Sequence, residues 1–181
     1  MLTPAKFNQP ATPSLGRTDG FTLVEVVLYV TIATTFFVAL VALLVMANNA
    51  RVKIQTAIEV EEQGQLVARQ ITAALRRATR LNYPLPGAAG SAVSFDTADS
   101  NKNPTVIAAT NGAWQITEGL AAAVPLTSPR VVVDSGQFIN LARPGTSGSL
   151  RVQFTLSHRN PSGRREYSYS QTFYGAATLR P

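Results

Sequence analysis

The longest apolar stretch of the chain runs from Val26 to Ala47 and contains no Asp, Glu, Lys or Arg. These residues, about 22 in number, would form roughly 33 Å of helix at about 1.5 Å per residue, which matches the hydrocarbon thickness of a bilayer. The pattern therefore predicts one membrane-spanning helix over residues 21–47.

A stripe of apolar and small residues follows this run. Its members are spaced alternately three and four residues apart, which places them on one face of a helix. They are Ala57, Val60, Gly64, Val67, Ile71, Ala74, Ala78 and Leu81. Because no proline occurs between Pro13 and Pro84, a single helix is predicted from about Phe21 to Leu81. Residues 48–82 are its amphipathic continuation, with the stripe packed against a sheet and the charges facing solvent.

Beyond Pro84 the pattern changes from helical spacing to alternation. Strands are predicted from Val93 and at 105–109, 113–117, 130–134, 138–142, 150–157 and 164–174. Asn111-Gly112 lies between two of them and is the strongest hairpin signal of the chain. A long helix followed by a run of strands predicts an α+β fold, in which residues 83–181 form an antiparallel β-rich head on the helix.

Composition limits the classes to which the chain can belong. After the membrane segment, the rest of the 181 residues suffices for one small domain. The sequence has no cysteine, which excludes disulfides and thiol chemistry, so the head must be held by its apolar core. The formal charge is +6 and the pI about 10.2, but the arginines are scattered without a compact basic block. Contact with DNA is compatible with this charge and is only weakly indicated.

Residues 1–20 have the composition of a leader. Three prolines and several polar residues give neither a period nor a core, and Lys6 and Arg17 are charges of the kind kept on the cytoplasmic side. The head is accordingly expected outside the cytoplasm, on a single-pass inner-membrane protein.

One carboxylate lies at the edge of the apolar run. Glu25 would cost a few kcal/mol if it entered hydrocarbon without a partner, so it indicates a function and requires a partner. A cut after Gly20 would give Phe21 a new α-amino group, positive at neutral pH, which could pair with Glu25 of the same or a neighbouring copy.

The string Gly20-Phe21-Thr22-Leu23-Val24-Glu25, with the apolar run behind it, resembles the processing site of type IV pilins and pseudopilins. The resemblance implies cleavage of the Gly20–Phe21 bond by a prepilin peptidase and N-methylation of Phe21. It also implies an assembly role for Glu25, which in the family neutralises the amino terminus of an adjacent subunit. The charged helix ending in Leu75-Arg76-Arg77-Ala78 is similar to the minor J-type pseudopilins.

Two other interpretations of the apolar run stay open at this point. A secretory signal would have an apolar core of about 7 to 15 residues, which is shorter than this one. An uncleaved signal anchor would leave the Gly-Phe-Thr-Leu-Val-Glu string without a role. The competing function is therefore an uncleaved membrane-anchored binding domain that contacts envelope polymer or DNA.

No pattern in the sequence predicts a catalytic or metal centre, and no cofactor is expected. His158, the only histidine, is predicted in a solvated turn. A string of oxygen-bearing side chains suggests a calcium loop, but Lys102 interrupts it, so a polar loop is the better interpretation. It consists of Asp96, Asp99, Asn101 and Asn103. The aromatic residues of the last strand and Trp114 are assigned to cross-strand packing.

The sequence thus predicts a structural subunit and no enzyme. Its expected partners are the prepilin peptidase, the inner membrane and other pilin or pseudopilin subunits. The filament to which it belongs could be a type IV pilus, a type II secretion system or a DNA-uptake apparatus.

Overall fold

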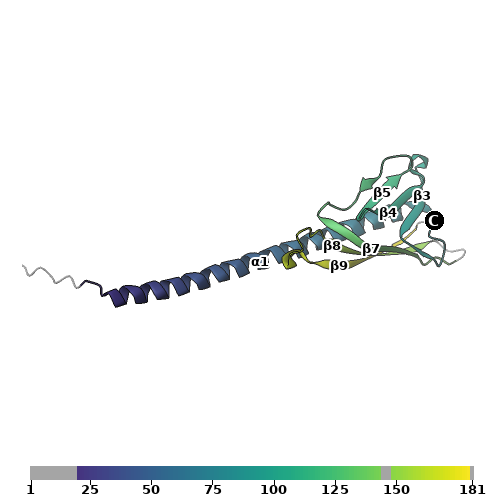
Figure 1. Ribbon diagram of the computed structural model, residues 1–181. Helices are drawn as coiled ribbons and strands as arrows, with labels where there is room; N and C mark the ends of the chain where they lie inside the picture. Colours follow the sequence, from purple (N-terminus) through teal and green to yellow (C-terminus); the bar gives the residue numbers. More distant parts are fainter. Residues whose placement is uncertain (1–19, 144–147, 180–181) are drawn as a thin grey trace, which may run out of the picture. The chain divides into compact units, whose positions relative to one another are not determined.

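The computed structural model describes residues 20–143 and 148–179. Residues 1–19, which make up nearly all of the predicted leader, lie outside the described residues. The chain divides into two compact units, Met1–Leu44 and Val45–Pro181. The predicted α+β fold is confirmed, because one long helix near the amino terminus is followed by antiparallel sheets (Figure 1).

Helix α1 runs from Leu23 to Arg76 and therefore ends earlier than the predicted Leu81. The backbone N–H of Arg77 closes the last turn on the carbonyl of Ala74 at 3.1 Å. Residues 78–83 then form strand β1 (Ala78–Tyr83), in which Leu81 pairs with Phe95. The helical spacing of Ala78 and Leu81 misled the prediction, since pairing with a strand distant in sequence overrides local propensity.

The strands form two sheets, whereas the sequence had suggested one. The five-stranded sheet has the order β1-β3-β4-β5-β6 and the four-stranded sheet the order β2-β7-β8-β9. In the first sheet β1 is joined by β3 (Ala92–Thr97), β4 (Thr105–Thr110), β5 (Ala113–Glu118) and β6 (Val124–Pro125). The second sheet contains β2 (Ala89–Gly90), β7 (Val131–Asn140), β8 (Ser149–His158) and β9 (Ser170–Thr178). Short 3₁₀ helices lie at Ser100–Lys102 and Arg165–Tyr167.

The predicted hairpin at Asn111-Gly112 is confirmed. Both residues have positive φ, 53° and 72°, and they join β4 to β5 in register from Thr110 and Ala113 outward. Positive φ at both central residues is what a two-residue hairpin turn requires, and Asn-Gly is the pair that adopts it most readily.

Strand β7 replaces the two strands predicted at 130–134 and 138–142. Its register on β8 shifts between Val133 and Ser135, and the buried positions change from odd numbers, Val131 and Val133, to even ones, Phe138 and Asn140. A bulge inserts one residue and so moves the following side chains to the other face. The interrupted alternation therefore looks like two strands in the sequence.

The last strand begins later than predicted. Residues 164–168 lie in a loop that contains the 3₁₀ helix Arg165–Tyr167, and β9 starts at Ser170. The alternation predicted for β8 is confirmed, because Leu150, Val152, Phe154 and Leu156 are all buried.

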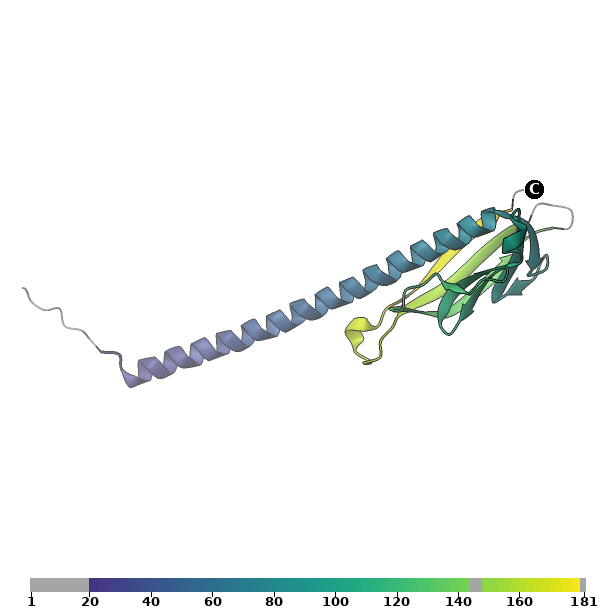
Figure 2. The same ribbon diagram turned by 90° about the horizontal axis from the view of Figure 1, so that it is seen from above.

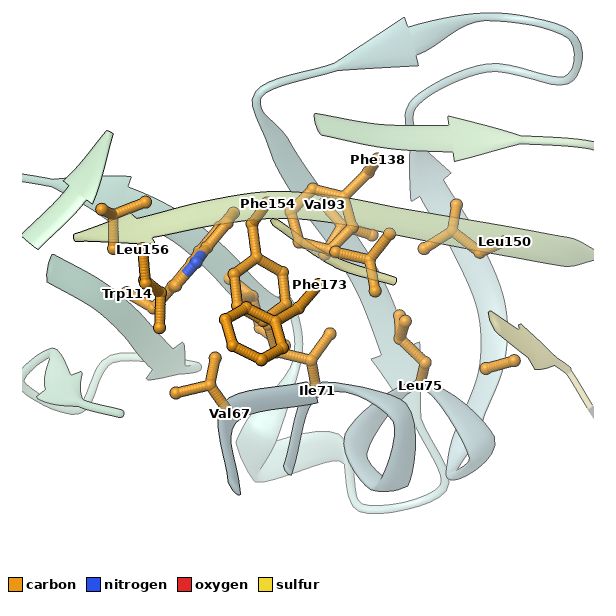
Figure 3. Packing of buried hydrophobic residues seen from close by; sticks show 14 of the residues in the cluster. Val67, Ile71, Leu75, Val93, Trp114, Phe138, Leu150, Phe154, Leu156 and Phe173 are labelled. Carbon is orange, nitrogen blue, oxygen red and sulfur yellow. The ribbon is translucent and has the colours of Figure 1, made fainter. Parts of the chain in front are cut away.

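One apolar core joins the second part of α1 to both sheets. The helix contributes Val60, Val67, Ile71 and Leu75, each at most 1% exposed, and much of the predicted stripe is thereby confirmed. Figure 3 shows Val67, Ile71 and Leu75 projecting from the helix toward the rings of Phe154 and Phe173. This part of α1 runs beside β9, which Figures 1 and 2 both show.

Aromatic rings form the centre of this core. Trp114 is fully buried and meets Phe138 and Phe154 edge-on, at 5.4 and 5.9 Å between ring centroids. Phe154 stacks on Phe173 at 5.5 Å. The packing role predicted for Trp114 and Phe173 is confirmed, while Tyr174 is 66% exposed.

Candidate functional site

The candidate site is the first turn of α1, where the sequence placed the processing and assembly residues. Thr22 precedes the helix, and its Oγ1 accepts a hydrogen bond from the backbone N–H of Glu25 at 3.3 Å. A Thr at this position satisfies one of the free N–H groups of the first turn, and a Glu three residues later is the usual second half of the motif. The string that resembles a processing site is thus also a helix start.

The two residues before Thr22 are open to solvent. Gly20 is exposed, and a Cβ added to it would meet no atom within 4 Å. Phe21 is 74% exposed. In the described part of the chain the Gly20–Phe21 bond therefore lies outside regular structure, between two exposed residues.

Glu25 has a partner one turn further along the helix. The hydroxyl of Tyr29 donates a hydrogen bond to Oε1 of Glu25 at 3.2 Å. The ring of Tyr29 also meets that of Phe21 edge-on, at 6.3 Å between centroids and 79° between planes. Phe21 and Glu25, which sequence reasoning named, are thereby brought together by Tyr29, which it counted only as part of the apolar run. The spacing of four residues from Glu25 was the signal that could have identified it.

The helix surface that follows is apolar and uncovered. From Phe21 to Met46 the large apolar side chains have exposed fractions between 43 and 81%. Among the described residues, α1 is the only helix long and apolar enough to cross a membrane, and none of its most apolar stretch is buried. A soluble monomer rarely exposes so continuous an apolar surface, so this segment is consistent with membrane anchoring.

His158 lies in a second polar cluster, and the predicted solvated turn is wrong. It is the last residue of β8, pairs with Val131, and has a side chain only 13% exposed. Its Nε2 lies 3.6 Å from Oε2 of Glu59 on α1, and its ring stacks on Tyr167 at 5.7 Å. The strand extends one residue into the predicted turn because β7 continues beside it.

Glu59 also contacts the loop before β7. Its Oε1 lies 3.4 Å from Nη1 of Arg130, and one turn further Gln63 accepts a hydrogen bond from the N–H of Ser128 at 3.2 Å. A cleft of about 400 Å³ lies here, lined on the helix side by residues from Val52 to Glu59. These contacts join α1 to the start of β7 and the end of β8. Among the residues named here, no nucleophile lies beside a base.

In the neighbouring β8–β9 loop, the pKa of the Glu166 carboxyl is lowered. The main cause is a hydrogen bond with its own backbone, and the positive charge of Arg164, 3.5 Å away, acts in the same direction.

The side chains considered for calcium, Asp96, Asp99 and Asn103, make hydrogen bonds within the protein, two of them in their own loop and Asp96 across to strand β1. Asp99 caps the 3₁₀ helix by accepting from the N–H of Asn101, and Asn103 accepts from the N–H of Thr97 at 2.7 Å. Asp96 accepts from Asn82 at 2.9 Å. Within residues 20–143 and 148–179, no three His, Asp or Glu side chains gather in a group that could hold a metal ion.

Comparison of the chain with protein-family models, with curated proteins and with solved structures gives no match.

Proposed function

We propose that the chain is a pilin-like filament subunit, a minor pilin or pseudopilin of a type IV pilus, a type II secretion system or a DNA-uptake filament. The observation that carries the proposal is a helix of two different parts. Its first part is bare, apolar and begins with the Gly-Phe-Thr-Leu-Val-Glu string, while its second part is buried in an α+β core. A long apolar helix joined to antiparallel sheets is a pilin-like layout.

Assembly in this proposal begins with proteolysis. The prepilin peptidase cuts the Gly20–Phe21 bond, and the new amine of Phe21 is then methylated. Because the bond is exposed and no atom crowds Gly20, the enzyme can reach it without unfolding α1. In the precursor the amine does not exist, so processing switches assembly on.

During assembly the exposed helix surface moves from lipid into a filament core, where packing of helix against helix replaces contact with lipid. Helices from many copies pack there, so that the exposed apolar side chains stay out of water, where each would cost about 1.5–3 kcal/mol. The contact between the amine of one copy and Glu25 of another removes two unpaired charges and sets the register of packing. The function is assembly, with no chemical step after processing.

The proposal is tested by mass spectrometry of the protein recovered from membranes. We expect a mature chain that begins with N-methylphenylalanine at Phe21. Gly20→Leu should block processing and leave membrane insertion intact, because the structure provides room for a side chain at this position. An intact leader on the wild-type protein would favour the competing function, an uncleaved membrane-anchored binding domain.

The assembly role is tested by Glu25→Ala. We expect normal insertion and cleavage but a lower share of the variant in filaments that are purified by pull-down of a second subunit. Glu61→Ala, which removes an exposed carboxylate from the second part of α1, is the matched control. If the Glu25 variant enters filaments as well as the wild type does, the amine–carboxylate contact is not needed for assembly.

A further inference from the structure

Glu25 is shielded although its helix segment is bare. From Gly20 to Asn48 every residue is exposed except Glu25, which is half-buried. The side chain that reaches the carboxylate is Tyr29, whose hydroxyl lies 3.2 Å from Oε1.

Tyr29 also contacts Phe21. Its ring packs edge-on against the Phe21 ring, at 6.3 Å between centroids, so Tyr29 touches both residues of the proposed amine–carboxylate pair. On the other side the backbone of Glu25 is fixed by the hydrogen bond from its N–H to Thr22 at 3.3 Å. Glu25 thus makes two hydrogen bonds, one from its backbone N–H to Thr22 and one from the Tyr29 hydroxyl to its carboxylate.

The hydrogen-bond partners of the two Glu25 carboxylate oxygens suggest what the side chain does. A glutamate three residues after the helix-capping Thr usually reaches back to the backbone N–H of that Thr. Here Oε1 is engaged by Tyr29, which lies in the opposite direction along the helix. In the part of the chain that the structure describes, Oε2 of Glu25 has no hydrogen-bond partner. One oxygen is therefore engaged within the chain, and the other is left for a further cation.

We propose that Tyr29 is a positioning residue for assembly: its hydroxyl holds one oxygen of Glu25, so that the other oxygen is presented to the amine of a neighbouring copy. This inference rests on the proposed function. The same hydrogen bond gives the carboxylate a polar partner in the lipid before any neighbour arrives, which an isolated charge in hydrocarbon requires.

Without the hydroxyl, two partners compete for the carboxylate. Glu25 can fold back on the Phe21 amine of its own chain, four residues upstream, or pair with a second chain. The pairing within one chain has the higher effective concentration, because no second subunit needs to arrive. A subunit that satisfies its own charges has less to gain from joining a filament.

The test is Tyr29→Phe, which keeps the ring and its contact with Phe21 and removes only the hydroxyl. A hydrogen bond to a charged group is worth enough to change an equilibrium about tenfold, so we expect about tenfold less of the variant in filaments. Tyr174→Phe, a hydroxyl deletion at an exposed position of β9, is the matched control and should assemble normally.

A double-mutant cycle separates this inference from the proposed function. If Tyr29 acts through Glu25, Tyr29→Phe lowers incorporation in the wild type and has no further effect in the Glu25→Ala background. An equal effect in both backgrounds, or normal assembly of Tyr29→Phe while Glu25→Ala is defective, overturns the role of Tyr29 alone. Normal assembly of Glu25→Ala overturns the proposed amine–carboxylate contact itself.

A second measurement does not depend on filaments. The full chain is reconstituted in lipid bilayers, and the infrared band of Glu25 is isolated as the difference between the wild type and Glu25→Gln. The same difference is then recorded in the Tyr29→Phe background. We expect the carboxylate band to shift when the hydroxyl is removed. Superimposable bands would show that the phenol does not contact the carboxylate and would refute the inference.

Discussion

Gly64 is the position at which α1 depends most on the absence of a side chain. It is buried in the middle of the helix stripe, and a Cβ built on it would overlap three ring carbons of Phe173 on β9. We predict that Gly64→Ala destabilises the Val45–Pro181 unit, although alanine is the better helix former.

Two opposing effects set the change in the free energy of unfolding that Gly64→Ala causes. Replacing a helical glycine with alanine gains about 1 kcal/mol of helix propensity. Overpacking a core costs about 1–3 kcal/mol, and here the upper end applies because the Phe173 ring cannot retreat. It is stacked on Phe154, which is fully buried and meets Trp114 at 5.9 Å. The net loss should be about 2 kcal/mol, or about 8 °C in Tm for a unit of this size.

Trp114 makes the measurement direct. It is the only tryptophan of the chain and lies in the core beside Phe154, so its near-ultraviolet circular dichroism reports on the packing of this unit. Thermal unfolding of the detergent-solubilised full chain would be followed for the wild type and for Gly64→Ala. Gln70→Ala, an exposed change on the same helix, is the control and should shift stability by less than about 0.5 kcal/mol.

A second substitution tests the cause. Phe173→Leu makes room for the methyl group, so in that background Gly64→Ala should cost much less than it does in the wild type. If Gly64→Ala is as stable as the wild type, or if its cost is unchanged beside Leu at position 173, the close contact between α1 and β9 is not what requires glycine.

Two further outcomes are expected. Asn140, which is 2% exposed, donates to the carbonyl of Pro84 at 2.8 Å and accepts from the N–H of Ala142 at 3.0 Å. Asn140→Ala should therefore lower the free energy of unfolding by about 2 kcal/mol in urea titrations. A loss below about 0.5 kcal/mol would contradict this role. Glu59→Ala removes the contacts with Arg130 and His158. Because these groups are partly exposed, the loss in the free energy of unfolding should stay below about 1 kcal/mol and shrink as salt is added. A loss of several kcal/mol that is independent of salt would show that the cluster is structurally essential.

Features that depend on neighbours in sequence could be predicted from the sequence. The uncharged run, the start of the helix at Thr22 and Glu25, the Asn111-Gly112 turn and the alternation of β8 all follow from spacing within one element. Local physical rules are sufficient there, because helix caps, two-residue turns and strand faces are set by residues a few positions apart.

Features that depend on residues far apart could not be predicted in this way. The end of α1 at Arg76 was decided by the pairing of Leu81 with Phe95, and the continuity of β7 by its bulge against β8. His158, only 13% exposed, contacts Glu59, which lies about 100 residues earlier in the chain. In each case a contact formed only in the folded chain outweighed a weak local preference.

The candidate site combines both kinds of information. The sequence by itself was sufficient to nominate the residues of the proposed processing and assembly site, Gly20, Phe21 and Glu25, because a charge at the edge of an apolar run is evident without coordinates. The structure adds that Tyr29 donates a hydrogen bond to the carboxylate and that Glu25 is half-buried in an otherwise exposed segment. The spacing of four residues makes this contact possible, but a carboxylate can accept from several nearby donors, so the sequence alone does not say which one it takes.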